Sequence, residues 1–154
     1  MRIRPATSAD SVNVLRWRND LGSRMGSRNS EIISSEAHEA WFEQVLSNPE
    51  RVLLIGESTD GQPLGQVRFD RIGTEGFAYE VSITLAPGAR GRELALPLLT
   101  AAEIFFLEPR GSLQLRAYVN NDNKASEHLF LGGGYSIDSL TEASGQWWVK
   151  EIHV

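Results

Sequence analysis

Residues 85–95 combine amino-acid types that suit the binding of a phosphate group. They join a strand-like run, Tyr79 to Leu85, to a helix-like run, Leu94 to Phe106. The first N–H groups of a helix lack partners within the helix, and the helix dipole adds partial positive charge there. Arg90 and Arg92 add full charges in a forked geometry that suits phosphate. The segment therefore predicts a site for a phosphorylated cofactor.

The composition is that of an ordinary globular protein, with 154 residues, 41% hydrophobic and 23% charged. The chain has no cysteine, which excludes disulfides, thiolate nucleophiles and cysteine zinc sites. Its three histidines lack the spacing of metal ligands, so we expect no metal. The net charge of −5 argues against general nucleic-acid binding. No apolar run has membrane-spanning length and no signal peptide is visible, so we expect a cytoplasmic protein without a membrane partner.

Hydrophobic periodicity and turn residues divide the chain into strands and helices. Strands are predicted at 1–5, 51–57, 64–72, 77–85, 113–119, 135–140 and 146–154. Helices are predicted at 7–20, 35–48, 92–106 and 123–131, and residues 23–33 are predicted to form a loop. Three strands in a meander, followed by a crossover helix to another strand, imply a mixed sheet. We expect an α+β (mixed α/β) fold with a mostly antiparallel sheet of six to seven strands and helices on both faces.

Two predicted helices carry apolar residues at helical spacing. On the first helix we expect Val12, Leu15 and Trp17 to face the core. On the second, the corresponding residues are Ala37, Trp41, Val45 and Leu46. In the last strand, Trp147-Trp148 places one indole on each face of the sheet. One indole should pack in the core, and the other should line either the contact of a homodimer or the mouth of the substrate site.

This order of elements, together with two motifs, resembles the GNAT family of acetyl-coenzyme A N-acetyltransferases. The turn motif of the family reads here as Arg90-Gly91-Arg92-Glu93-Leu94-Ala95. The second motif reads Asn123-Lys124-Ala125-Ser126, followed by Gly134-Tyr135. The resemblance covers essentially the whole chain and implies one acetyltransferase domain over residues 1–154, with acetyl-coenzyme A as cosubstrate.

The N-terminal half resembles one branch of that family. The matching segments are Trp17-Arg18-Asn19-Asp20, Glu31-Ile32, His38-x-x-Trp41-Phe42 and Gly65-Gln66-Val67-Arg68-Phe69. The branch acetylates the 4-amino group of a UDP-linked amino sugar in the biosynthesis of pseudaminic acid and related nonulosonic acids. Protein N-terminal acetyltransferases that act on ribosomal proteins share parts of this layout and remain an alternative.

The resemblance also implies how the cofactor lies. Its pantetheine arm would pair with the strand Val81 to Leu85 as an added strand would, and a backbone N–H near Ser82 to Thr84 would face the thioester oxygen. Its diphosphate would lie on the amides from Arg90 to Ala95. The residues implied in cofactor binding are Ile83, Thr84, Leu85, Arg90, Gly91, Arg92, Glu93, Leu94, Ala95, Asn123, Ser126 and Phe130.

Two positions depart from the pattern of the family. Glu93 stands where the family usually has glycine, and we expect its carboxylate to point outward, away from the diphosphate. Phe130 stands where many members place a tyrosine that protonates the leaving thiolate. Phenylalanine cannot donate a proton, so water, Ser126 or His128 would have to serve instead.

The catalytic candidates are Glu80, Ser126 and His128. Glu80 lies at the start of the strand that would carry the acetyl group, and it is our first candidate for the general base; the alternative is a solvent-facing strand carboxylate. His38 titrates in the right range for a base, but a structural or substrate-positioning role is the stronger interpretation. The residues implied in substrate binding are Trp17, Arg18, Asn19, Arg24, Asn29, His38 and Trp41.

Three functions are consistent with these features. The first is acetyl transfer to a nucleotide-linked amino sugar by direct attack of the amine, which requires a closed pocket with a basic end. The second is acetylation of a protein N-terminus, which requires an open groove for an extended peptide. The third is a catalytically silent coenzyme A-binding module, which the identities of Glu93 and Phe130 suggest.

Overall fold

The computed structural model describes residues 1–26, 31–74 and 76–153. The strands are β1 (Arg2–Pro5), β2 (Arg51–Glu57), β3 (Pro63–Arg71), β4 (Ala78–Leu85), β5 (Leu113–Asn120), β6 (Ser136–Glu142) and β7 (Gly145–Ile152). The α-helices are α1 (Ser11–Asn19), α2 (Leu21–Met25), α3 (Ser35–Ser47), α4 (Ala95–Leu107) and α5 (Lys124–Gly132). Two short 3-10 turns, η1 (Ser8–Asp10) and η2 (Pro87–Ala89), precede α1 and follow β4. Within the described ranges, no helix is both long enough and apolar enough to span a membrane.

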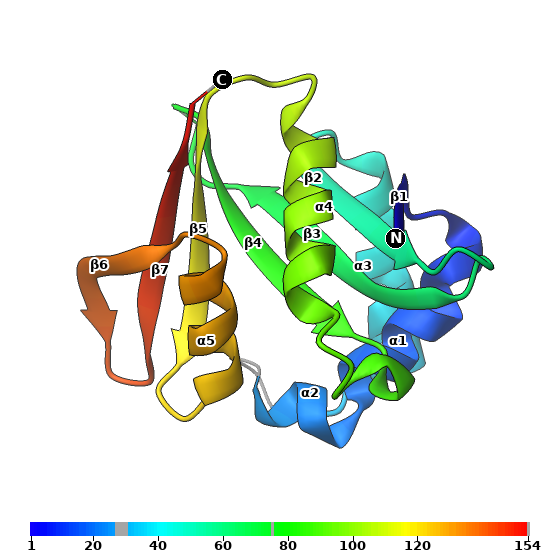
Figure 1. Ribbon diagram of the computed structural model, residues 1–154. Coiled ribbons are helices and arrows are strands. Elements are labelled where there is room, and N and C mark those ends of the chain that lie inside the picture. Colours follow the sequence, from blue (N-terminus) through cyan, green and yellow to red (C-terminus); the bar gives the residue numbers. More distant parts are fainter. Residues whose placement is uncertain (27–30, 75, 154) are drawn as a thin grey trace.

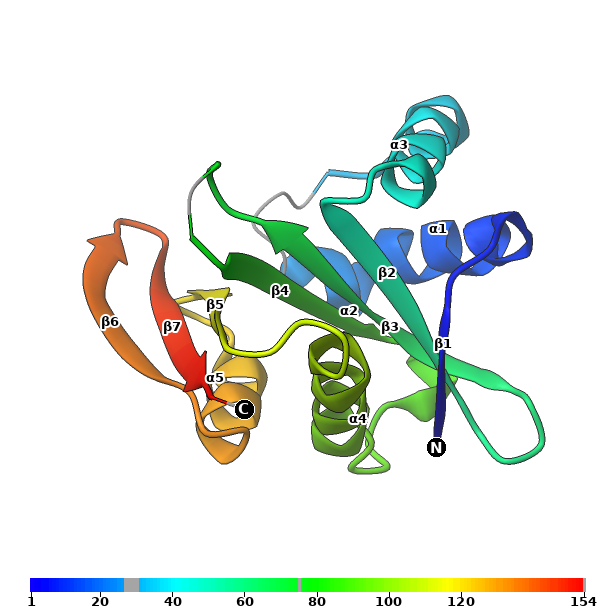
Figure 2. The ribbon, with the colours of Figure 1, turned by 90° about the horizontal axis from the view of Figure 1, so that it is seen from above.

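The seven strands form one sheet in the order β1-β2-β3-β4-β5-β7-β6 (Figure 1). Every neighbouring pair is antiparallel except β4 and β5, which are parallel and joined by the crossover through α4. Seen from above, α1 and α3 lie on one face of the sheet and α4 and α5 on the other (Figure 2). The mixed, mostly antiparallel sheet with helices on both faces, which the sequence predicts, is confirmed.

Each face of the sheet has its own hydrophobic core. On one face α4 packs against β2 to β5, and the ring of Phe106 stacks on that of Phe69 with centroids 4.1 Å apart. On the other face Val14 and Trp17 of α1 join α3 and β2. Because Leu54 faces the first core while Leu53 faces the second, β2 is a continuous apolar run.

The parallel pair β4 and β5 stays in register over only a short length. The register joins Ala78 to Gln114, Tyr79 to Leu115 and Glu80 to Arg116. Beyond Glu80 the two strands separate, and Figure 1 shows the gap widening toward the end near α2 and α5. Along the same length, β4 keeps its full register with β3, from Arg71–Tyr79 to Gly65–Leu85. The sheet is therefore intact on one side of β4 and open on the other.

The backbone groups of β4 that face this gap follow from strand alternation. The N–H of Ala86 donates to the carbonyl of Leu64, and the carbonyl of Ala78 accepts from Ile72, so even-numbered residues here bond toward β3. The carbonyl of Phe77 accepts from Gln114 of β5. Because successive residues of a strand direct their backbone groups to opposite sides, the N–H and C=O groups of 81, 83 and 85 point into the gap.

Two predictions about helices are wrong in their bounds. Residues 23–33 are not all loop, since α2 occupies Leu21–Met25 and begins where the Asp20 side chain accepts a hydrogen bond from the N–H of Gly22. The helix predicted from Arg92 begins only at Ala95. Gly91 and Glu93 have positive φ angles of 72° and 56°, which are incompatible with a right-handed helix.

The predicted inward faces of α1 and α3 also need correction. Val12 is 67% exposed and Leu15 is half-buried, whereas Trp17 is buried as predicted, together with Val14. On α3 the buried residues are His38, Phe42 and Val45, whereas Ala37 and Leu46 are exposed and Trp41 is half-buried. Trp148 packs in the core as expected for one of the two indoles, and Trp147 lies on the opposite face against Tyr118.

At Gly65, β3 lies very close to the end of β4. A Cβ atom at this position would lie 2.6 Å from the carbonyl oxygen of Thr84 and 3.0 Å from Leu98 Cδ2. We expect Gly65→Ala to lower the free energy of unfolding by about 2 kcal/mol, because a backbone atom cannot move aside at low cost. Chemical denaturation measures the change. Gly88→Ala is the matched control, since a Cβ atom there would contact nothing within 4 Å; equal stability of the two variants would contradict the prediction.

Candidate active site

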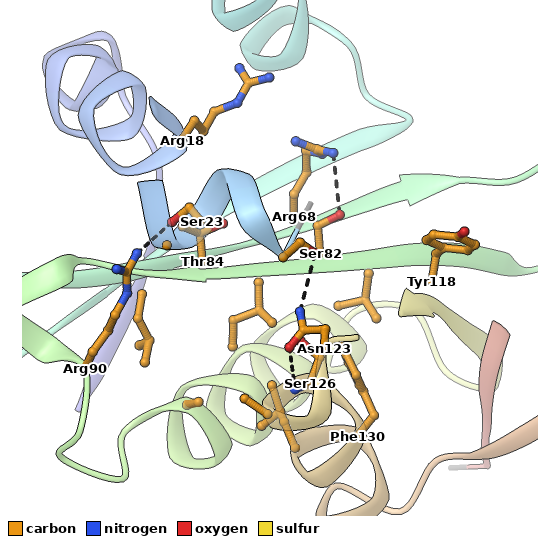
Figure 3. Close-up of a pocket in the computed structure, with 18 of the residues that line it drawn as sticks. Arg18, Ser23, Arg68, Ser82, Thr84, Arg90, Tyr118, Asn123, Ser126 and Phe130 are labelled. Atoms are coloured by element: carbon orange, nitrogen blue, oxygen red, sulfur yellow. Dashed lines mark hydrogen bonds between the residues drawn. The ribbon is translucent and has the colours of Figure 1, made fainter. Parts of the chain in front are cut away.

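A cavity of about 750 Å³ occupies the gap between β4 and β5. Its wall is β4 from Glu80 to Leu85, and Tyr118 of β5 lies across from it (Figure 3). Residues of α5 line it from one face of the sheet, whereas Arg18 of α1 and Arg68 of β3 line it from the other. Two molecules entering from opposite faces of the sheet could therefore meet beside β4.

The α5 side of the cavity is built around a helix cap. Asn123 precedes α5, and its Oδ1 accepts a hydrogen bond of 3.1 Å from the N–H of Ser126. Its amide nitrogen donates to the carbonyl of Gly26, at 3.4 Å, which ties α5 to the segment after α2. One helical turn further on, Phe130 is buried and its ring meets that of Tyr135 edge-on, with centroids 5.0 Å apart.

The turn between β4 and α4 presents backbone amides at the same end of the cavity. Leu94 is the N-cap of α4, and its side chain makes no capping bond to the first N–H groups of this 13-residue helix, which have no partner within the helix itself. Ala95 and Gly91 line the cavity. Glu93 is exposed and is not among the lining residues, which agrees with the outward orientation that the sequence predicts. The turn therefore offers partial positive charge without a nearby Glu93 carboxylate.

Arg90 links this turn to α2. Its Nη1 donates to Asp20 Oδ2 at 2.6 Å. Its Nη2 donates to Ser23 Oγ at 2.7 Å, a bond that Figure 3 shows. The guanidinium of Arg90 lowers the pKa of Asp20, so this carboxylate stays charged. A single guanidinium thus holds α2 over the end of the cavity where the α4 amides lie.

On the opposite face of the sheet, alternation gives the cavity a polar wall. Tyr79, Val81, Ile83 and Leu85 pack toward α4, so Glu80, Ser82 and Thr84 face the other side. Arg68 lies beside them on β3, where its Nε donates to Asp70 Oδ2 at 2.8 Å and its Nη2 reaches Ser82 Oγ at 3.5 Å. Glu80 is half-buried and lines the cavity where β4 and β5 begin to separate.

The structure brings most of the predicted cofactor residues into one cavity. Those that line it are Ile83, Thr84, Leu85, Arg90, Gly91, Ala95, Asn123, Ser126 and Phe130. Arg92, Glu93 and Leu94 belong to the same turn but do not line the cavity. Of the catalytic candidates, Glu80 and Ser126 line it, whereas His128 is exposed on α5 and does not.

The predicted substrate residues are more dispersed. Arg18 lines the cavity. Trp41 and His38 of α3 contact Arg18 but do not line the cavity themselves. Trp17 is in the core. Asn19 exchanges two 2.7 Å hydrogen bonds with the backbone of Ile33, and the Nε of Arg24 donates to the carbonyl of Asn19. Asn19 and Arg24 therefore make hydrogen bonds to the backbone on either side of α2. Asn29 lies outside the described residues.

Several cavity residues were absent from the sequence-based set. They are Gly22, Ser23, Gly26, Tyr118 and Leu129. Arg68 and Ala125 also line the cavity, and in the sequence they were named only as members of family motifs. A usable signal existed for Tyr118, because residues 114, 116, 118 and 120 alternate with the apolar residues of β5 and must share its other face. No comparable local signal marks Ser23, which reaches the cavity only through the unpredicted helix α2. In the described part of the chain, no three His, Asp or Glu side chains gather closely enough to hold a metal ion.

Comparisons with known proteins agree with this geometry. The family model of the acetyltransferase (GNAT) domain matches residues 1–135. No curated protein matches the chain in sequence. Spermidine N-acetyltransferase from Vibrio cholerae, in a complex with CoA and spermine, superposes with a TM-score of 0.81 at 15% identity, over 99% of this chain and 94% of that one.

Two further solved structures are similar over nearly their whole length. A domain from Methanocaldococcus jannaschii has a TM-score of 0.81 at 18% identity, covering 98% of this chain and 97% of that one. A phosphinothricin acetyltransferase from Sinorhizobium meliloti, in complex with AcCoA, has a TM-score of 0.78 at 16% identity, covering 99% and 88%. At such identities the likeness shows the shared fold, and the acceptor must be argued from the site itself.

The left-handed backbone at Glu93 predicts a measurable strain. The left-handed conformation costs a residue with a Cβ atom about 1–2 kcal/mol. Glycine avoids this strain, but its greater conformational freedom in the unfolded chain offsets part of the gain. We expect Glu93→Gly to raise the free energy of unfolding by about 0.5–1 kcal/mol in chemical denaturation. Glu93→Gln keeps the Cβ atom and should bring no such gain. A glycine variant no more stable than the glutamine variant would show that the turn is unstrained.

Proposed function

This chain belongs to the GNAT acetyltransferase family, and from that premise we propose that it transfers the acetyl group of acetyl-coenzyme A to the primary amine of a small molecule. One observation carries the proposal: one cavity runs through the gap between β4 and β5, with the amides at the start of α4 and Arg90 at one end and Glu80 near the other. A cofactor and an amine that enter from opposite faces of the sheet would meet against β4.

The residues present fit acetyl-coenzyme A. The N–H and C=O groups of 81, 83 and 85 point into the gap and can pair with the amides of a pantetheine arm as those of an added strand would. The amides at the start of α4 and the charge of Arg90 suit the diphosphate. Asn123 and Ser126, at the start of α5, border the same space.

The chemistry is a direct attack of the amine on a thioester. Bound acetyl-coenzyme A supplies the thioester, whose carbonyl carbon bonds to the amine nitrogen while its sulfur leaves as the thiol. The chain offers no cysteine for a covalent intermediate. The N–H of Ile83 points into the gap and lies within the Ser82 to Thr84 segment expected to face the thioester oxygen, so it is the donor that we propose for the negative charge developing there.

Two proton transfers accompany this attack. We assign to Glu80 the removal of a proton from the amine, since it lines the cavity on the acceptor side. Ser126 lines the α5 side and is the proposed donor, directly or through water, to the leaving sulfur. The position expected to carry a tyrosine holds Phe130, which cannot donate, but a thiol with a pKa of about 8.5 leaves readily without full acid assistance.

For the acceptor we propose a nucleotide-linked amino sugar. The N-terminal motifs that resemble the amino-sugar branch support it, and so do the two arginines, Arg18 and Arg68, at the acceptor end of the cavity. Acetylation of a protein N-terminus is the second candidate, favoured by the same N-terminal layout. A catalytically silent module is the third, and Phe130 is the observation in its favour.

A thiol-release assay tests these candidates together. The protein is mixed with acetyl-coenzyme A and a panel of UDP-linked 4-amino sugars, ribosomal N-terminal peptides and polyamines. We expect turnover with the amino sugars. Binding of acetyl-coenzyme A in a calorimetric titration without turnover on any amine would favour the silent module, and the absence of binding would overturn the proposal.

Glu80→Gln tests the base. Glutamine keeps the size and polarity of the side chain but cannot accept the proton from the amine. We expect kcat to fall at least tenfold at neutral pH, with the fall diminishing at high pH as free amine becomes abundant. The Kd of acetyl-coenzyme A, measured by calorimetry, should not change. Unaltered kcat would remove Glu80 from the mechanism.

Asp20→Asn tests the contact between α2 and the cofactor end of the cavity. The Asp20 carboxylate occupies the Arg90 guanidinium and competes with a diphosphate for it. Asparagine also caps helices, so the start of α2 should persist while the negative charge is lost. We expect the Kd of coenzyme A to fall several-fold in calorimetry at low salt. Weaker binding would mean instead that Asp20 prepares Arg90 for the diphosphate.

A further inference from the structure

We propose that Arg18 and Arg68 form a binding site for an anionic group of the acceptor, so that the amine acetylated here carries a carboxylate or a phosphate. This inference rests on the proposed function and specifies its substrate class. The two arginines come from α1 and β3 and line the cavity on the face opposite α5 (Figure 3). Glu80 lines the same part of the cavity, so the site presents two positive groups and one negative group to the acceptor.

Arg18 is held in place by an aromatic ring and a histidine. Its guanidinium carbon lies 3.9 Å from the centroid of the Trp41 indole, a cation–π contact. Its Nη1 lies 3.4 Å from His38 Nδ1. Both partners come from α3 and both are uncharged, so they fix the direction of the guanidinium without neutralising it.

The protonation of His38 follows from its second contact. Nε2 lies 3.0 Å from the carbonyl oxygen of Ser11, which can only accept, so Nε2 must carry the proton. In the neutral ring Nδ1 then has a lone pair and accepts from Arg18. Burial, with 0% of the residue exposed, and the nearby Arg18 charge both lower the pKa of His38, which keeps it neutral. His38 is therefore a positioning residue for Arg18.

The charges around Trp41 are unbalanced. The guanidinium carbons of Arg68 and Arg51 lie 5.2 Å and 5.8 Å from the same ring centroid. Asp70 receives hydrogen bonds from both, at 2.8 Å and 2.9 Å. Within the described ranges Arg18 forms no ion pair of its own. In the described part of the chain, Asp70 thus pairs with two of these three guanidinium groups, and Glu80 is the carboxylate that lines the cavity.

This imbalance costs energy in the free protein. Loss of water around Arg18, together with repulsion by Arg68 and Arg51, lowers its pKa to about 10. A carboxylate or phosphate in the cavity would restore the balance and could receive two hydrogen bonds from the planar guanidinium. A polycation would be repelled by the same groups. The proposed acceptor therefore presents its amine toward Glu80 and its anionic group toward Arg18.

Binding of anions to the protein saturated with coenzyme A tests the site without requiring turnover, because the cofactor blocks the Arg90 end. Inorganic phosphate and glutarate are titrated while chemical shifts are followed by NMR. We expect at least one anion to bind saturably and Arg18→Gln to raise its Kd at least tenfold. Arg16→Gln is the matched control, since it removes the same charge from the exposed side of α1. No saturable binding, or equal binding by the two variants, would overturn the proposal.

Two further variants separate positioning from folding. Arg18→Lys keeps the charge and should retain more affinity than Arg18→Gln. His38→Leu removes the acceptor for Arg18 and should weaken anion binding, whereas His38→Gln supplies an amide oxygen and should restore part of it. The Kd of coenzyme A should be the same in all of these variants. Anion binding unaffected by His38→Leu would remove His38 from the site.

Kinetics then identify the source of the anion. Acetylation is compared for an amino-sugar nucleotide against its free amino sugar, and for an amino acid against its amide. We expect kcat/KM to be at least tenfold higher for the anionic member of the preferred pair, and this preference to vanish in Arg18→Gln. Preference for the nucleotide indicates a phosphate and preference for the amino acid a carboxylate. Equal use of both members of each pair, or preferred use of spermidine, would contradict the inference.

Discussion

The cavity exists because β4 and β5 stop pairing after Glu80. A parallel pair needs a crossover, and α4 supplies it while packing Phe106 on Phe69 beneath the sheet. The register ends at Glu80 and Arg116, so every backbone group of β4 that would have bonded to β5 beyond this point faces a cavity. Phe130 and Leu129 of α5 line this cavity from one face of the sheet.

The arginines at the two ends of the cavity have different partners. At the α4 end, Arg90 already has a carboxylate partner in Asp20, so a diphosphate must exchange with an existing contact. At the other end, the described partners of Arg18 are the indole of Trp41 and neutral His38, and neither carries a negative charge. The first arrangement couples cofactor binding to α2. The second arrangement leaves the charge of Arg18 available to an anionic substrate. This difference supports the proposed assignment of the cofactor and acceptor ends.

Much of the fold was accessible from the sequence, because strand alternation and turn residues are local signals. The bounds of β2, the helix that follows Asn123 and the placement of Trp147 and Trp148 on opposite faces of the sheet illustrate this. The features that the sequence did not predict depend on contacts between residues far apart in the chain. The contact between α2 and the turn before α4 is made by Arg90, which lies 70 residues from Asp20 in the sequence. The helix α4 starts late because Glu93 adopts a left-handed conformation despite its helix-favouring side chain. The grouping of Arg18, Arg51 and Arg68 around Trp41 required the packing of α1 and α3 on the sheet.

The short pairing between β4 and β5 also determines what borders the entrance of the cavity. Among the described residues, strand pairing joins β1 to β4 with β5, β7 and β6 at residues 78–80 and 114–116. At the other end, near α2 and α5, the two sides are linked by the hydrogen bond from the Asn123 amide to the carbonyl of Gly26. The entrance is therefore bordered by side chains and helix ends rather than by paired backbone, so substitutions there can reshape it and leave the hydrogen bonds of the sheet in place.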